Sequence, residues 1–220
     1  MPPRDATGTA DYWVPLFVFG VFTTAESYTP LSWYPWVYLG KVCAITVTLA
    51  VYSRGLRDIV PAWRVVVPAI AVGLVIFAQW VLLDRWIPYP LLGTRTAYDP
   101  FTALTSRLPL VTLLTARFYG LVVLVPIIEE LFWRDFMLRY ATDSNFERVP
   151  IGTHSAMAFW LVAIGSAVTH PEWLVALVAG CLFALLLRWT RSLFAAIVAH
   201  ATANLALGVY ILISHQWQYW

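Results

Sequence analysis

The chain has 220 residues, of which 60% are hydrophobic and only 12% charged, and its formal net charge is +2. A mean hydropathy of +0.72 exceeds what a soluble domain of this length needs, so the composition indicates an all-α, polytopic membrane protein. The small net charge gives no indication of nucleic-acid binding. We therefore expect one membrane-embedded domain over residues 1–220, without a separate soluble domain.

About seven apolar stretches along the chain are candidate membrane spans. The first, residues 12–25, is the shortest and weakest, and a tilted or re-entrant helix is its alternative. The longest connection, residues 84–107, is rich in proline and glycine and predicts a loop with a short interfacial helix. The remaining six candidate spans are residues 34–52, 65–83, 108–133 (continuing as helix to Tyr140), 155–169, 173–187 and 193–213.

The arginines between these stretches predict an orientation. With seven spans, nine arginines fall on one side of the membrane and three on the other. Basic residues collect in cytoplasmic loops, so the first side is expected to be cytoplasmic, with the amino terminus inside. The nine are Arg4, Arg54, Arg57, Arg64, Arg134, Arg139, Arg148, Arg188 and Arg191, and the three are Arg85, Arg95 and Arg107.

Two adjacent carboxylates and an arginine end the fourth apolar stretch, in the sequence Val-Pro-Ile-Ile-Glu-Glu-Leu-Phe-Trp-Arg at 125–134. Ionisable groups inside a membrane helix are costly, so they suggest function first. Glu130 and Arg134 are four residues apart and are expected to form an ion pair. Glu129 lies about 100° further round the helix and is not neutralised by that contact. We expect it to face another group.

Three more polar residues occupy apolar segments: His170 ends the fifth, and His200 and Asn204 lie in the seventh. The spacing of His200 and Asn204 places both on one helix face, and the surrounding alanines permit close helix packing. We predict that these three residues and Glu129 line one cavity, nearer the cytoplasmic side. Taken singly, each is also explained as an interhelical hydrogen-bonding group. Glu172, beside His170, is expected to be a solvated helix cap.

Several mechanisms are excluded by spacing. The chain has no HExxH or GxSxG motif, and the predicted spans contain no mid-span aspartate for an aspartyl dyad. A glutamate that activates water, assisted by histidine and asparagine, remains for bond hydrolysis. Two rivals stay open: a non-catalytic immunity or sorting partner, and a proton-coupled carrier. A carrier should show internal symmetry between its halves, which the sequence lacks.

The three motifs together resemble the CAAX-protease and bacteriocin-processing family of intramembrane proteases, which includes the type II CAAX prenyl endopeptidases. The EExxxR motif corresponds to 129–134, and HxxxN corresponds to 200–204. A second motif, an aromatic residue ahead of a histidine, corresponds to 166–170, with Ser166 where the family often has phenylalanine. The likeness extends over a motif-bearing core of about residues 108–213. Segments 146–152, 191–193 and 216–220 look like the bacterial CAAX-protease-related proteins that accompany exosortase sorting systems.

This resemblance implies roles for the matching residues. Glu129 would be the general base, His170 would hold the attacking water, and His200 with Asn204 would stabilise the oxyanion. Glu130 and Arg134 would support them. It implies a membrane-associated protein substrate, a bacterial inner-membrane location within the lipid bilayer, and a link to an exosortase-type sorting system. No cofactor is needed for this reaction, and zinc held by the histidines and a glutamate is the alternative.

Overall fold

The computed structural model describes residues 6–220, and that part of the chain is helical without strands. The α-helices are α1 Ala10–Tyr28, α2 Tyr34–Val51, α3 Val66–Trp86, α4 Pro100–Ala103, α5 Arg107–Tyr119, α6 Val125–Glu130, α7 Leu138–Tyr140, α8 Ala156–Ala167, α9 Trp173–Thr190 and α10 Leu193–Ser214. Two π-helical segments, η4 Gly120–Leu124 and η5 Leu131–Met137, flank α6. Short 3₁₀ turns are η1 Ala6–Thr9, η2 Arg54–Asp58, η3 Trp63–Val65, η6 Phe146–Arg148 and η7 Trp217–Tyr219.

Five helical segments are long and apolar enough to cross a membrane, which confirms the predicted class of helical membrane protein. They are Tyr34–Val51, Trp63–Trp86, Arg107–Tyr140, Trp173–Thr190 and Leu193–Ser214. Helices α1 and α8 correspond to the other two predicted spans, but they do not meet the same criteria. Helix α8 has 12 residues. At about 1.5 Å per residue it covers about 18 Å, less than the hydrocarbon core of a bilayer. The count of seven spans remains a prediction.

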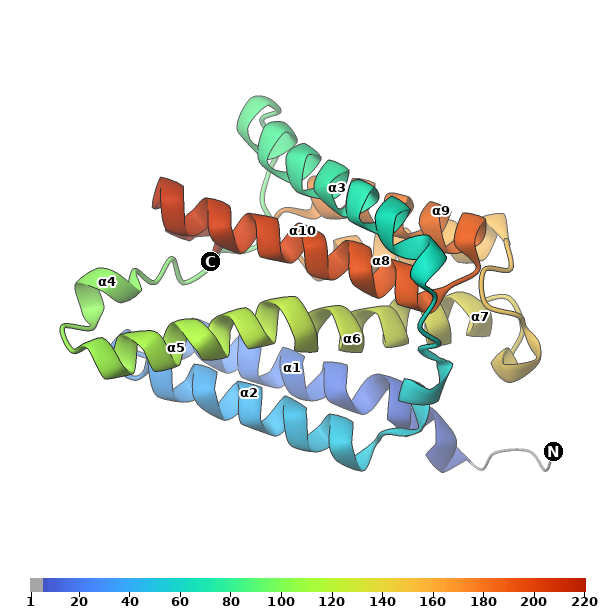
Figure 1. Cartoon of the computed structure of the whole chain (residues 1–220), viewed down its shortest axis with the longest axis horizontal. Helices are drawn as coiled ribbons and strands as arrows, with labels where there is room; N and C mark the ends of the chain where they lie inside the picture. The colour runs from blue at the N-terminus through green and yellow to red at the C-terminus, as the bar shows by residue number, and fades with distance from the viewer. Residues whose placement is uncertain (1–5) are drawn as a thin grey trace.

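The helices form two layers (Figure 1). Helices α1 and α2 pack together beside the long helix that runs from α5 through α7, and α3, α9 and α10 form the second layer. The second layer is held by apolar side chains, including buried alanines of α10 that pack with α3 and α9. A Cβ atom added to Gly73 of α3 would lie 2.4 Å from the carbonyl oxygen of Ala199. The predicted close packing around the α10 alanines is therefore present, with Gly73 as the partner.

The predicted long fourth helix is continuous over Arg107–Tyr140, but its two π-helical segments were not predicted. A π-helical turn bonds residue i to i+5, so it changes which side chains share a face and is frequent at functional sites. Because η4 and η5 lie on either side of α6, they bracket Glu129 and Glu130. Side-chain periodicity in an apolar helix does not reveal such a change.

The connections gather at opposite ends of the bundle. Residues 52–65, 141–155 and 191–192 lie at one end, and residues 87–106 and the carboxy-terminal turn lie toward the other (Figure 1). Arg4 falls outside the described residues. Arg134 and Arg139 are buried in the long helix and do not belong to a loop, which corrects part of the predicted distribution.

Candidate active site

Glu130 is the centre of a buried polar cluster at the junction of α6 and η5. It is 0% exposed. Its Oε1 atom lies 3.3 Å from Nη1 of Arg134 and 2.8 Å from Nδ1 of His200 on α10. The contact with Arg134 is the predicted one, whereas the contact with His200 was not predicted. One carboxylate oxygen therefore ties the long helix to α10.

Phe183 of α9 contacts both the arginine and the histidine of this cluster. The Arg134 guanidinium lies 5.0 Å from the centroid of the Phe183 ring, and the His200 ring stacks on Phe183 with centroids 5.0 Å apart. A cation over an aromatic face is attracted by the ring's quadrupole. Phe183 was missed in the sequence because an aromatic residue in an apolar helix is ordinarily a packing residue.

Glu129 stands apart from this cluster. It is 7% exposed. Within residues 6–220 its carboxylate makes no hydrogen bond and no ion pair. This agrees with the expectation that Arg134 does not neutralise it. Glu129 is a buried carboxylate left available for another group.

His200 and Asn204 line the same cavity, as expected from their spacing on α10. The cavity has a volume of about 30 Å³ and lies between α3, α9 and α10. The Asn204 Nδ2 atom donates to the carbonyl oxygen of Leu121, 2.8 Å away in η4. The prediction that Glu129 and His170 line this cavity too is wrong, because Glu129 lies on the long helix and His170 in the turn after α8. The lining residues are Ile76, Phe77, Trp80, Ala179, Phe183, His200, Ala203, Asn204 and Leu207.

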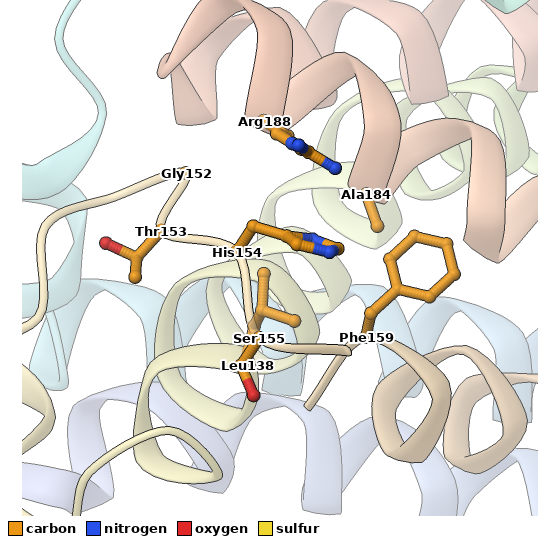
Figure 2. A pocket seen from close by; sticks show the side chains of 8 residues that line it. All are labelled: Leu138, Gly152, Thr153, His154, Ser155, Phe159, Ala184 and Arg188. Atoms are coloured by element: carbon orange, nitrogen blue, oxygen red, sulfur yellow. The ribbon is translucent and has the colours of Figure 1, made fainter. Parts of the chain in front are cut away.

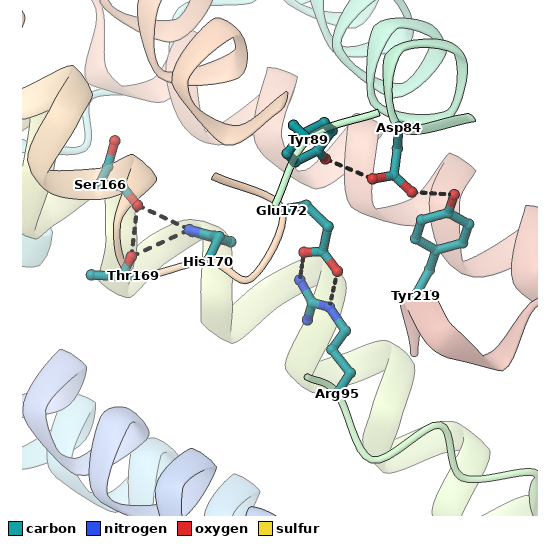
Figure 3. Close-up of polar contacts among 8 residues, drawn as sticks. All are labelled: Asp84, Tyr89, Arg95, Ser166, Thr169, His170, Glu172 and Tyr219. Carbon is teal, nitrogen blue, oxygen red and sulfur yellow. Dashed lines mark hydrogen bonds and ion pairs between the residues drawn. The ribbon is translucent and has the colours of Figure 1, made fainter. Parts of the chain in front are cut away.

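His170 lies in the turn between α8 and α9. Its Nδ1 atom is 3.0 Å from the carbonyl oxygen of Ser166 and 3.2 Å from Oγ1 of Thr169 (Figure 3). Its ring forms a T-shaped contact with the ring of Trp80, with centroids 5.9 Å apart, and Trp80 lines the cavity. His170 thus borders the residues of the cavity through Trp80.

The departure from the second motif has a packing explanation. The Ser166 side chain is buried, and its Oγ atom lies 3.1 Å from where a Cβ of Gly180 would be. Helices α8 and α9 therefore approach closely at this pair, which leaves no room for a phenylalanine at position 166 in this packing. The small residue belongs to the interface between the two helices.

Glu172 is not the solvated cap that the sequence suggested. It is 5% exposed and forms no side-chain cap on α9. Its two carboxylate oxygens accept from Nε and Nη2 of Arg95 at 2.9 and 2.7 Å (Figure 3). The expectation was wrong because Arg95 reaches Glu172 from a loop 77 residues away, a contact that local sequence cannot indicate.

A second carboxylate–arginine pair lies one turn beyond the first. Asp135 is fully buried and pairs with Arg139, whose Nε atom donates to the carbonyl oxygens of Phe146 and Val149 at 3.1 and 2.8 Å. Among the described residues, the polar contacts of Arg139 go to its own helix or to the loop that follows it. This pair fixes the loop after α7, and it lies outside the cluster of Glu130.

A second, smaller cavity of about 10 Å³ lies between α7, the loop that follows it, α8 and α9 (Figure 2). None of the predicted site residues lines it. Its lining residues are Leu138, Gly152, Thr153, His154, Ser155, Phe159, Ala184 and Arg188. The volume is about that of a single water.

The zinc alternative can be compared with the side chains that are present. In the part of the chain that the structure describes, no group of three or more His, Cys, Asp or Glu side chains is placed to hold a metal ion. His170 and His200 belong to different clusters, with Nδ1 of each already hydrogen-bonded. We therefore derive no step through a metal.

The fold and the site together define the class: an integral membrane protein, all-helical over the described residues, with a buried carboxylate–arginine–histidine cluster. Residues 111–206, a little under half of the chain, match the family model described as type II CAAX prenyl endopeptidase Rce1-like. The matched segment is thus of the CAAX-protease type and contains all six predicted site residues, Glu129, Glu130, Arg134, His170, His200 and Asn204. No curated protein and no solved structure matches the chain. The link to exosortase systems stays a prediction.

Proposed function

We propose that the chain is an intramembrane endopeptidase of the glutamate type, which cleaves a membrane-associated protein in a bacterial inner membrane. The observation that carries the proposal is the difference between two adjacent glutamates. Glu130 is bonded to Arg134 and His200, whereas Glu129 is buried and makes no bond to a described side chain. A carboxylate without a protein partner is available to take a proton from water.

In the proposed reaction, Glu129 removes a proton from a water molecule, and the resulting hydroxide attacks the scissile carbonyl carbon. The tetrahedral oxyanion accepts hydrogen bonds from His200 and Asn204. The proton on Glu129 then passes to the leaving amide nitrogen, the C–N bond breaks, and a carboxylate and an amine are released. His170 assists in holding the water.

The charges of the site support these roles. A carboxylate only accepts hydrogen bonds, so Nδ1 of His200 donates to Glu130, and Nε2 is left for the substrate. Nε2 donates as well when the ring is protonated. With a protonated His200 ring, the charges of Arg134 and His200 balance those of Glu130, which both contact, and of Glu129, which neither contacts, so the four buried charges sum to zero. Neutrality of this kind is what a low-dielectric interior favours.

The cavity supports an apolar substrate. His200 and Asn204 are its polar lining residues, and aromatic and aliphatic side chains from α3 and α9 make up most of the remainder. The cavity of about 30 Å³ has room for about two waters and not for a peptide, so its lining indicates the chemistry of the substrate and not a bound pose. The proposed substrate is therefore a membrane-tethered or hydrophobic carboxy-terminal segment, such as one processed by an exosortase-type system.

The decisive experiment is cleavage of candidate co-expressed, tail-anchored proteins by purified protein in lipid nanodiscs. Glu129→Gln should lower turnover by about 10²–10⁴, because the amide cannot act as the base. Its melting temperature should match that of the wild type, since no bond to a described residue is lost. Asp143→Asn, at an exposed loop carboxylate, is the control. Wild-type turnover by Glu129→Gln would refute the proposal.

The non-catalytic sorting partner is the second candidate, and one observation favours it. Glu129 and His170 do not line the cavity that holds His200 and Asn204. A protein that only binds its client needs no convergence of these groups. If the wild type binds a client and leaves it intact in the same nanodisc assay, this second function replaces the first.

A further inference from the structure

The loop between α3 and α5 is fastened to the turn that carries His170. The Leu92 amide donates to the carbonyl oxygen of Pro171 at 2.9 Å, and the indole nitrogen of Trp173 donates to the carbonyl oxygen of Pro90 at 2.8 Å. In addition, the Arg95 guanidinium donates two parallel hydrogen bonds to the Glu172 carboxylate (Figure 3). Three separate contacts thus bind residues 90–95 to residues 171–173.

The Arg95–Glu172 pair is the strongest of these contacts. A guanidinium that meets a carboxylate with two parallel bonds fixes both distance and orientation. The Glu172 side chain is 7% exposed and the Arg95 side chain is 30% exposed, so water reaches the pair from the side of the arginine only. Burial by itself would raise the pKa of the Glu172 carboxyl, but the hydrogen bonds and charge of Arg95 outweigh burial and hold that pKa below its ordinary value.

The pair also lies near the candidate catalytic groups. Glu172 is two residues from His170, whose Nδ1 lies 3.0 Å from the carbonyl oxygen of Ser166 at the end of α8. Burial lowers the pKa of the Arg95 guanidinium, but Glu172 and, to a smaller extent, the charge of Glu129 raise it above its ordinary value. The negative charge of Glu129, the candidate base, therefore stabilises the charged form of Arg95. It lies outside the segment 111–206 that matches the protease family.

We propose that Arg95 and Glu172 are a positioning pair, which holds the α8–α9 turn against the loop and thereby sets the place of His170. The inference rests on the proposed function for its effect on catalysis. Neither residue needs to touch the substrate. The loop supplies a restraint that the short helix α8 cannot supply alone, because α8 ends before His170 and only a turn connects it to α9.

The first test measures catalysis with a double-mutant cycle on one membrane-tethered substrate. Glu172→Gln and Arg95→Gln should each lower kcat by about 10-fold to 100-fold, because a misplacement of about 1 Å has that effect, while KM stays within about twofold. In a His170→Ala background the same substitutions should have little further effect, since the group they position is gone. The exchange Arg95→Glu with Glu172→Arg should recover most of the loss. Arg85→Gln, an exposed arginine on the same side, is the matched control.

The second test measures the turn without using activity. Spin labels are placed at Val168→Cys and Tyr140→Cys, two exposed positions, in a background with Cys43→Ser and Cys181→Ser. The distance distribution between the labels should be narrow with an intact pair and broad with Glu172→Gln. A broadened distribution in a protein that cleaves nothing would overturn the proposed function and support the role of the pair. An unchanged distribution, or additive effects with His170→Ala, would overturn the inference.

Discussion

Nδ1 of His200 lies 2.8 Å from the same Glu130 oxygen that Arg134 approaches to 3.3 Å. The histidine and the arginine therefore share one acceptor atom, while Oε2 of Glu130 and Nε of Arg134 are buried with no partner among the described residues. A histidine that bonds a carboxylate through Nδ1 is held in one tautomer and one orientation. The bond to Glu130 consequently leaves Nε2 as the ring nitrogen of His200 that is available to the cavity.

Arg134→Ala should reduce the folded yield sharply. The substitution leaves the fully buried Glu130 with only His200 as a partner, and breaking a buried ion pair costs about 3–5 kcal/mol. The measurement is the fraction of monodisperse protein after detergent extraction, together with its melting temperature. Arg134→Lys, which keeps the charge, should lose less. A stable but inactive Arg134→Ala would instead place the arginine in direct contact with the reacting groups.

Asn204→Ala and His200→Ala should both lower kcat by about 10²–10³, the cost of removing one oxyanion donor. Asn204→Ala also frees the Leu121 carbonyl, a loss of about 1 kcal/mol that leaves the bundle folded. Thr202→Ala is the control on the same helix, because its hydroxyl bonds only its own helix. Each variant is assayed with and without a strong chelator. Activity that disappears with chelator and returns with zinc would contradict the glutamate–water mechanism.

Gly73→Ala should destabilise the bundle by about 1–3 kcal/mol. The new methyl group would lie 2.4 Å from the Ala199 carbonyl oxygen and 2.7 Å from Cβ of Thr202, and neither atom is at the end of a flexible side chain. Gly20→Ala is the matched control, since its Cβ would meet nothing within 4 Å. Thermal unfolding in nanodiscs compares the two. Equal melting temperatures of Gly73→Ala and Gly20→Ala would contradict the prediction, because they would show that α3 and α10 can move apart without loss of stability.

The Arg95–Glu172 pair predicts a pH dependence of stability. The folded-state pKa of Glu172 is depressed, so its contribution is complete above the unfolded-state value of about 4.3 and is lost as the pH falls through the folded-state value. The melting temperature of the wild type should exceed that of Glu172→Gln by a constant amount above about pH 5. That difference should shrink toward pH 3. A difference that stays constant to pH 3 would show that the carboxylate contributes nothing through its charge.

Local sequence determined the membrane class and several contacts of the site. An apolar stretch long enough to cross a bilayer forms a helix there, because its backbone must satisfy its own hydrogen bonds. The helices Trp173–Thr190 and Leu193–Ser214 could therefore be predicted from the sequence. A spacing of four residues on such a helix is a contact by geometry, which is why the Glu130–Arg134 pair and the shared face of His200 and Asn204 were predictable.

The tertiary structure alone decided which partners meet across helices. The π-helical segments beside α6 alter the helical phase, so spacing could not show that Glu130 would face His200 or that Asn204 would reach Leu121. Arg95 and Glu172 are 77 residues apart, and each alone resembles an ordinary loop charge. Whether a charge is solvated or buried depends on what packs over it, and that is a property of the folded bundle.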